Sequence, residues 1–235
     1  MKEFCKRNGI FLGLSLILVV VLGLGLLGMP KGELHLMLCD RHSHARDIFY
    51  RYYTHVGEWF PYVLCIALLL FGRIGHGVFA SAAMLLSTLS TQILKHIFVA
   101  PRPVTWFGEH MPHIDLPLVE GVKMNLWYSF PSGHTTSFFA MTLLACILIT
   151  DHLTAKRSNS ANGLTAKRSY SAAVQLLLFL AATLGAYSRI YLSQHFAMDV
   201  FAGILVGELI TILCYVVFIR YKDQKWFNYR LISKK

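Results

Sequence analysis

The sequence predicts an all-α protein, a bundle of six transmembrane helices with a short external amphipathic helix between the first two. Of its 235 residues, 55% are hydrophobic and 14% are charged, whereas about 25% of the residues in an ordinary soluble domain are charged. The hydrophobic residues gather in six separate segments, which can cross a hydrocarbon core of about 30 Å with the help of their flanks. We therefore expect a single membrane-embedded domain over residues 1–235.

The first predicted span covers residues 9–29, which contain no charged side chain. At about 1.5 Å per residue this run is long enough to cross the membrane. Lys2, Lys6 and Arg7 precede it, as in a signal peptide. The apolar run is too long for a signal peptide, however, and no A-x-A cleavage pattern follows it. We expect an uncleaved first helix.

Five further apolar segments predict the remaining spans. They cover residues 59–72, 77–94, 135–150, 170–188 and 200–219. The first of these five is short and needs its flanks to cross. The last is interrupted only by Glu208, which could pair with a polar neighbour inside the bundle or act as a proton relay.

The segment 30–57 is predicted to be external and to contain the amphipathic helix. Apolar and aromatic side chains recur in it at helical spacing, with charged ones among them: Ile48, Phe49, Tyr52, Tyr53 and Val56, beside Arg46, Asp47 and Arg51. Such a helix can lie in the membrane interface with its rings at headgroup depth. His42 and His44 near Asp40 suggest a metal site, but positions two apart do not share a helix face, so we expect no metal.

The Lys and Arg residues set the predicted orientation, because cytoplasmic loops carry an excess of positive charge. Most of the 22 fall in the N-terminus, at Arg73, in the 151–169 loop and in the basic 220–235 tail. We therefore expect both termini in the cytoplasm, with the 30–57 and 100–133 loops outside. The net charge of +10 does not indicate nucleic acid, since no basic stripe with interleaved aromatic residues is present.

Two further sequence features carry no functional prediction. The hexapeptide LTAKRS starts at Leu153 and again at Leu164, and we interpret the repeat as a duplication tolerated in a flexible loop. The five cysteines form no CxxC pair, so neither a disulfide framework nor a zinc site is predicted.

Polar clusters lie at three predicted helix ends, where polar residues are costly and therefore informative. In the first cluster, Pro101 and Pro103 should end the third span, leaving Lys95 on the helix and Arg102 just beyond it. Two cations then approach one point. Taken alone, both could equally be anchors whose charged heads reach the membrane interface.

The second cluster, Pro131-Ser132-Gly133-His134, starts the fourth span. Serine is a favoured N-cap, glycine lets a ligand approach the backbone, and the free amides of a helix start favour an anion. His134 then lies on the first turn beside that anion. The alternative is an ordinary capped helix start with an interfacial histidine.

The third cluster joins the fifth and sixth spans and contains Ser188, Arg189, His195 and Asp199. His195 and Asp199 are four residues apart and share a helix face. A carboxylate that holds one imidazole nitrogen leaves the other free to attack. Alone this pair could be structural, but the predicted topology puts all three clusters on the outer face. Together they offer the cations, nucleophile and acid that phosphoryl transfer needs.

The three clusters resemble, at every signature position and in order, the motifs of the type 2 phosphatidic acid phosphatase (PAP2) superfamily: Lys95-x6-Arg102-Pro103, Pro131-Ser132-Gly133-His134 and Ser188-Arg189-x5-His195-x3-Asp199. The resemblance implies a metal-independent mechanism without a cofactor, in which His195 attacks phosphorus, Asp199 orients it and His134 protonates the leaving group. It also implies that the phosphoryl oxygens are held by Lys95, Arg102, Ser132, Gly133 and Arg189.

The resemblance further implies a multi-pass lipid phosphatase of the bacterial inner membrane, with its active site facing the periplasm or exterior. The expected partner is a membrane lipid phosphate, with no nucleic acid and no obligate protein partner. Bacterial members of similar size act on undecaprenyl pyrophosphate, phosphatidylglycerol phosphate or lipid A phosphates, and the resemblance favours the lipid A and undecaprenyl group. The external loop 104–130 is the expected selectivity element.

Other functions remain open from the sequence. Phosphatidylglycerol phosphate, phosphatidic acid or a soluble sugar phosphate could each be the substrate. Vanadium haloperoxidases share the motifs, but they are soluble, and six spans argue against them. A catalytically silent lipid-binding or transport protein is supported by Glu208 beside Gly203-x3-Gly207, where small residues let helices approach closely.

Overall fold

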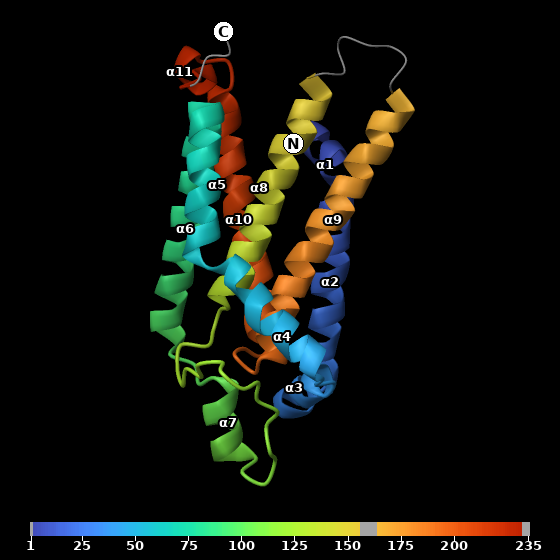
Figure 1. The fold of residues 1–235 in the computed structure, drawn as a ribbon, viewed down its shortest axis with the longest axis vertical. Helices are drawn as coiled ribbons and strands as arrows, with labels where there is room; N and C mark the ends of the chain where they lie inside the picture. The colour runs from blue at the N-terminus through green and yellow to red at the C-terminus, as the bar shows by residue number, and fades with distance from the viewer. Residues whose placement is uncertain (1, 156–163, 232–235) are drawn as a thin grey trace.

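A computed structural model describes residues 2–155 and 164–231, and all of their regular structure is helical, as predicted. The long helices run up and down the bundle, and the short helices α1 and α11, near the two ends of the chain, lie at the same end of it (Figure 1). The helices are α1 Lys2–Arg7, α2 Gly9–Gly28, α3 Lys31–Cys39, α4 His44–Tyr53, α5 Trp59–Gly72, α6 Ile74–Phe98, α7 Pro103–His110, α8 Gly133–Ala155, α9 Leu164–Tyr191, α10 Ala197–Phe218 and α11 Lys225–Asn228. The LTAKRS repeat borders residues 156–163, which lie outside the described residues, as do 232–235 of the predicted tail.

Five of the predicted spans are long and apolar enough to cross a membrane by themselves. The second predicted span, α5, meets that test only together with the helical residues before it, from which it is bent by 48°. Those residues are α4 and a 3-10 turn, η1, at Thr54–Gly57. The described residues therefore contain five candidate spans, or six when the bent pair counts as one.

Helix α8 lies at the centre of the bundle and packs on α6, α9 and α10. Its contact with α10 depends on Gly203 and Gly207. A Cβ atom added to Gly207 would lie 2.5 Å from the Thr136 carbonyl oxygen, and one added to Gly203 would lie 2.8 Å from that of Ser132. Both distances are shorter than van der Waals contact, so these glycines let the start of α10 lie directly against the start of α8.

The segment 30–57 differs from the prediction, because it forms two helices where one was expected. Helix α4 is amphipathic as predicted, with Ile48, Phe49 and Tyr52 exposed, and Ser43 caps it by accepting a hydrogen bond from the Arg46 amide at 3.5 Å. Helix α3 was not predicted. Its apolar residues show no clear helical stripe, and it is held instead by tertiary burial of residues such as His35.

The loop 100–133, which was predicted to be external, also contains a helix that was not predicted, α7, which begins at Pro103. Proline is well suited to the first position of a helix, where its missing N–H group is not needed. In Figure 1, α3, α4 and α7 gather at the end of the bundle opposite α11. This end also holds the polar clusters.

Candidate active site

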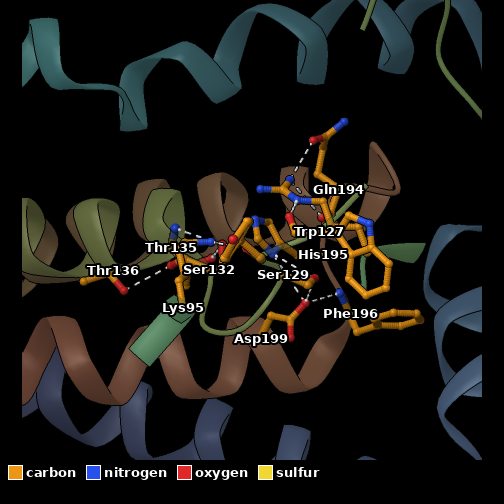
Figure 2. Close-up of polar contacts among 12 residues, drawn as sticks. Lys95, Trp127, Ser129, Ser132, Thr135, Thr136, Gln194, His195, Phe196 and Asp199 are labelled. Carbon is orange, nitrogen blue, oxygen red and sulfur yellow. Dashed lines mark hydrogen bonds and ion pairs between the residues drawn. The ribbon is translucent and has the colours of Figure 1, made fainter. Parts of the chain in front are cut away.

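The three predicted clusters meet at one end of the bundle (Figure 2). The Ser132 amide donates to the Asp199 carbonyl oxygen at 2.9 Å, which joins the second cluster to the third. The Arg102 guanidinium donates to the Gln194 carbonyl oxygen at 3.2 Å, which joins the first cluster to the third. The structure thus brings together residues that lie up to a hundred positions apart in the sequence.

His195 is buried in the turn between α9 and α10 and is held by two polar groups. Its Nδ1 lies 3.3 Å from Asp199 Oδ2 and 3.4 Å from Ser129 Oγ. Asp199 Oδ2 is itself fixed by the Ser129 hydroxyl at 2.5 Å and the Phe196 amide at 2.9 Å. An Nδ1–H directed at the carboxylate leaves the lone pair on Nε2, the nitrogen that can attack.

The surroundings of His195 keep its ring neutral. Burial lowers the pKa of His195 well below its usual range, and the charges of Arg102, Arg189 and Lys95 lower it further. A buried charge next to other positive charges is unfavourable, so the proton is lost. The result is an unprotonated, oriented imidazole at neutral pH.

Three buried cations surround His195, namely Lys95, Arg102 and Arg189. Each is held by uncharged oxygens. Lys95 donates to the Tyr128 carbonyl oxygen, Arg102 donates to that of Trp127 at 3.0 Å, and Arg189 donates to Thr54 Oγ1 at 2.6 Å.

These three cations have no carboxylate within 4.0 Å among the residues that the structure describes. The Nε of Arg189 is also buried without a hydrogen-bond partner in this part of the chain. Buried charges are normally paired, because desolvation is expensive. The arrangement is therefore suited to an anion with several oxygens.

The start of α8 faces the same point. Ser132 Oγ accepts a hydrogen bond from the Thr135 hydroxyl at 3.0 Å and from the Thr135 amide at 3.4 Å, so Ser132 caps the helix as predicted. These contacts leave the Ser132 hydroxyl hydrogen available to an anion. Gly133 follows, and its lack of a side chain leaves the first amides of α8 accessible.

His134 lies on the first turn of α8, at the rim of the site. Its side chain is 28% exposed, and its Nε2 lies 3.9 Å from Glu58 Oε1. Glu58 in turn accepts a hydrogen bond from His55 Nδ1 at 2.7 Å. A second histidine–carboxylate pair therefore borders the site, in contact with solvent.

Several residues at the site were missed by sequence reasoning. Thr54 and Glu58 come from the bend before α5, while Ser129 and Gln194 flank the motifs. Gln194 Oε1 accepts from Arg102 at 3.0 Å. Their only sequence signal was polarity near predicted helix ends, and their partners are set by tertiary packing.

Helix α3 packs behind the turn that carries His195. The His35 ring lies with Nε2 3.3 Å from Ser193 Oγ, and the Lys31 ammonium lies 3.9 Å from the centre of the Phe196 ring. Ser193 Oγ donates to the Pro117 carbonyl oxygen at 3.1 Å, so His35 Nε2–H is the donor to Ser193. Burial lowers the pKa of His35 to about 4, which keeps this ring neutral.

The 104–130 loop contributes backbone oxygens to the site. Besides Trp127 and Tyr128, the Lys123 carbonyl oxygen accepts from Gln194 Nε2 at 3.1 Å. A pocket of about 500 Å³ opens beside Lys95 and Arg102. Its other lining residues are Gln92, His96, Asn125, Leu126, Trp127 and Tyr128.

Of the residues considered for a metal, His42 has other partners. His42 lies with Nδ1 3.0 Å from Asp47 Oδ1 and stacks on the Tyr191 ring at 4.3 Å between centres. Within residues 2–155 and 164–231, no group of three or more His, Cys, Asp and Glu side chains is placed to hold a metal ion.

Comparison with known proteins places the chain in a family. The PAP2 superfamily matches residues 76–223. The lipid A 4'-phosphatase of Porphyromonas gingivalis is 26% identical over 183 residues, which are 75% of this chain and 68% of that protein. The crystal structure of Aquifex aeolicus LpxE matches with a TM-score of 0.58 and 25% identity, covering 78% of this chain and 93% of LpxE.

A second solved structure supports the same fold. The PAP2-type phosphatidylglycerolphosphate phosphatase of Bacillus subtilis matches with a TM-score of 0.60 and 20% identity, over 94% of this chain and all of that one (100%). The family match covers more than half of the chain and includes all three motifs. The chain therefore belongs to the PAP2 superfamily and is a membrane phosphatase of that superfamily.

Proposed function

We propose that this protein removes phosphate from a membrane lipid of the lipid A or undecaprenyl pyrophosphate type through a phosphohistidine at His195. The observation that carries this proposal is the neutral, clamped imidazole among three buried cations that lack a carboxylate partner in the described residues. A phosphoryl group would neutralise those cations and present its phosphorus to Nε2.

Binding comes first in the proposed mechanism. Lys95, Arg102 and Arg189 donate to the phosphoryl oxygens, joined by the Ser132 hydroxyl and the first amides of α8 at Gly133. Donors fixed in advance in a buried site stabilise the charge of the transition state without reorganisation. The backbone oxygens that hold these cations keep them aimed at one point.

In the first chemical step His195 Nε2 attacks phosphorus, and the bond from phosphorus to the lipid oxygen breaks. Asp199 stabilises the positive charge that develops on the ring. His134 gives its proton to the departing oxygen. In the second step the oxygen of water attacks phosphorus, His134 takes a proton from that water, and the bond from phosphorus to His195 Nε2 breaks. Its electron pair returns to Nε2, and inorganic phosphate leaves.

Glu58 is the feature that suits His134 to this role. A carboxylate at 3.9 Å favours the protonated imidazole, and the exposed rim gives access to solvent protons. The His195 side chain, in contrast, is buried and cannot exchange protons with solvent as readily.

The relatives and the placement of the site support the proposed substrate class. The lipid A 4'-phosphatase and LpxE are 26% and 25% identical to this chain, whereas the phosphatidylglycerolphosphate phosphatase is 20% identical. The pocket beside Lys95 offers room for a headgroup. The positive-inside pattern of the Lys and Arg residues supports an orientation in which this end of the bundle faces the periplasm or exterior.

One of the two observations that favoured a catalytically silent lipid-binding or transport protein now has a structural explanation. Gly203 and Gly207 are accounted for by the contact between α10 and α8. Glu208 is the remaining feature of that alternative, although its buried carboxyl group has the Ser15 hydroxyl of α2 as a polar neighbour inside the bundle.

The test is phosphate release by purified protein in detergent with EDTA. The panel contains lipid A, undecaprenyl pyrophosphate, phosphatidylglycerol phosphate, phosphatidic acid and a soluble sugar phosphate. Wild type should act best on one of the first two, His195→Ala should be inactive, and His44→Ala, an exposed control, should keep full activity. No release from any substrate would support the silent alternative, and EDTA inhibition reversed by one metal would overturn the mechanism.

A further inference from the structure

A second cavity lies at the other end of the bundle, where α5 ends and α6 begins. Its volume is about 780 Å³, and its walls come from α5, α6, α8, α10 and the segment after α10. Figure 1 shows α11, which closes one side, at the end opposite α3, α4 and α7. The cavity shares no lining residue with the candidate active site.

The wall formed by α11 is held by specific contacts. A Cβ atom added to Gly75 would lie 2.3 Å from the Phe227 ring, so the ring packs directly on the α6 backbone. The Ile74 amide donates to the Tyr229 carbonyl oxygen at 3.0 Å, and Asn228 Nδ2 donates to that of Lys222 at 2.6 Å. The cavity is therefore a defined part of the fold.

One side of the cavity is apolar and continues onto the membrane-facing surface. Phe79 and Phe218 lie deep in it, with ring centres 5.6 Å apart. Leu68 and Phe71 line it from α5 and are 65% and 53% exposed. On a membrane-spanning bundle such exposed apolar side chains face lipid chains.

The rim of the cavity is basic. Arg7 is paired with Asp151 at 3.1 Å. Arg73, Lys222 and Arg230 have no carboxylate within 4.0 Å in the described part of the chain, and Asp223 is the remaining acidic group in the lining. The rim therefore carries an excess of positive charge next to an apolar wall.

We propose that this cavity binds an anionic phospholipid of the cytoplasmic leaflet. Its phosphate contacts Arg73, Lys222 and Arg230, and its acyl chains run along Leu68 and Phe71. Basic pockets between helices on the cytoplasmic side suit such headgroups. The apolar wall matches a lipid better than a soluble phosphate, which would leave it uncovered. The leaflet rests on the proposed orientation, but binding itself does not depend on the proposed reaction.

The experiment measures lipid retention and thermal unfolding of purified full-length protein in detergent. Phosphatidylglycerol should be retained at one saturable site and raise the Tm, while phosphatidylethanolamine and inorganic phosphate should do neither. A double variant, Arg73→Gln with Arg230→Gln, should bind phosphatidylglycerol about 30-fold more weakly, since each cation near an anionic surface contributes roughly fivefold.

Two controls separate this site from the rest of the protein. Lys2→Gln with Lys6→Gln removes two exposed cations outside the cavity lining and should leave binding unchanged. His195→Ala should lose phosphate release but still bind phosphatidylglycerol, so the two proposals fail separately. Equal retention of phosphatidylethanolamine by wild type, an equal Tm rise with inorganic phosphate, or unweakened binding by the double variant would overturn the proposal. The wild-type measurements with phosphatidylglycerol, phosphatidylethanolamine and inorganic phosphate test the proposal even if the double variant does not fold.

Discussion

His195 and His134 lie at the same end of the bundle but differ in exposure and in carboxylate partner. The His195 side chain is 2% exposed and points Nδ1 at Asp199, while the His134 side chain is 28% exposed and lies 3.9 Å from Glu58. Burial and the neighbouring cations lower the pKa of His195, while solvent reaches the His134 ring at the rim of the same site. Two identical side chains can therefore take different roles when their exposure and their carboxylate partners differ.

The two carboxylates are also placed by different means. Asp199 is on the first turn of α10, but His195 precedes the Phe196 N-cap and lies outside the helix, so the two do not share a helix face as predicted. They meet because the Asp199 carboxylate folds back over the start of α10, where it also accepts the Phe196 amide. Glu58 comes from the bend before α5 and meets His134 only through tertiary packing. The first pair was therefore indicated by its short separation in the sequence, and the second was not.

The largest expected effect comes from replacing the buried histidine. His195→Ala should lower kcat/KM by at least about 10⁴-fold on every substrate, because it removes the nucleophile. Steady-state kinetics on an alkyl lipid phosphate and on nitrophenyl phosphate would measure it, with a thermal unfolding scan to check folding. A folded variant with a loss under about tenfold would remove His195 from this role.

The exposed histidine should give a smaller, substrate-dependent effect. His134→Ala should lower the rate on an alkyl phosphate by roughly 10²–10⁴-fold, the usual contribution of a general acid. On nitrophenyl phosphate, whose leaving group needs no proton, the loss should be much smaller. Equal losses on the two substrates would contradict the assignment of His134 as the acid.

Glu58→Gln should have a modest effect. A unit charge about 4 Å away contributes roughly 1 kcal/mol in a water-like environment, so activity on an alkyl phosphate should fall about fivefold. Less of His134 would be protonated at neutral pH, and the activity maximum should move to lower pH. Glu33→Gln, an exposed carboxylate on α3, is the matched control; an unmoved pH profile for Glu58→Gln would separate Glu58 from His134.

The smallest effect on activity is expected at His35, where stability is the main readout. Burial lowers its pKa from 6.5 to about 4 in the folded protein, so the unfolded chain binds its proton first as pH falls. Its contribution to the unfolding free energy is full above pH 6.5 and is lost towards pH 4, by up to about 3 kcal/mol. His35→Phe should flatten the acid side of a pH–stability curve, and an unchanged slope would contradict this.

The sequence predicted those features that local physics determines. Apolar length identified the spans, prolines 101 and 103 marked the end of α6, and Ser132 marked the cap of α8. The second span shows the limit, since α5 reaches membrane length only with the bent segment before it. Two short helices escaped prediction. Helix α3 has no clear apolar stripe, and α7, with 8 residues, is too short for a periodic pattern to stand out, although Pro103 in the first helical position was a usable signal.

At the site, the motif residues were predictable but their supports were not. The cations were expected to converge, yet the oxygens that hold them come from Thr54 and from the backbone of Trp127 and Tyr128. Backbone oxygens leave no trace in sequence pattern. The sequence likewise does not show that Gly203 and Gly207 allow α10 to approach the α8 backbone, because this depends on their contacts in the folded protein.

Trapping the covalent intermediate tests most directly whether His195 is the nucleophile. Rapid quenching with ³²P-labelled substrate, followed by peptide mapping under alkaline conditions, would locate the phosphoryl group. Nitrophenyl phosphate with His134→Ala is the best pair, because loss of the base that activates water should slow hydrolysis and let label accumulate. If His195 is the nucleophile, we expect a base-stable, acid-labile label on the peptide containing His195 and none in His195→Ala. Label on another residue, or equal labelling in His195→Ala, would contradict it.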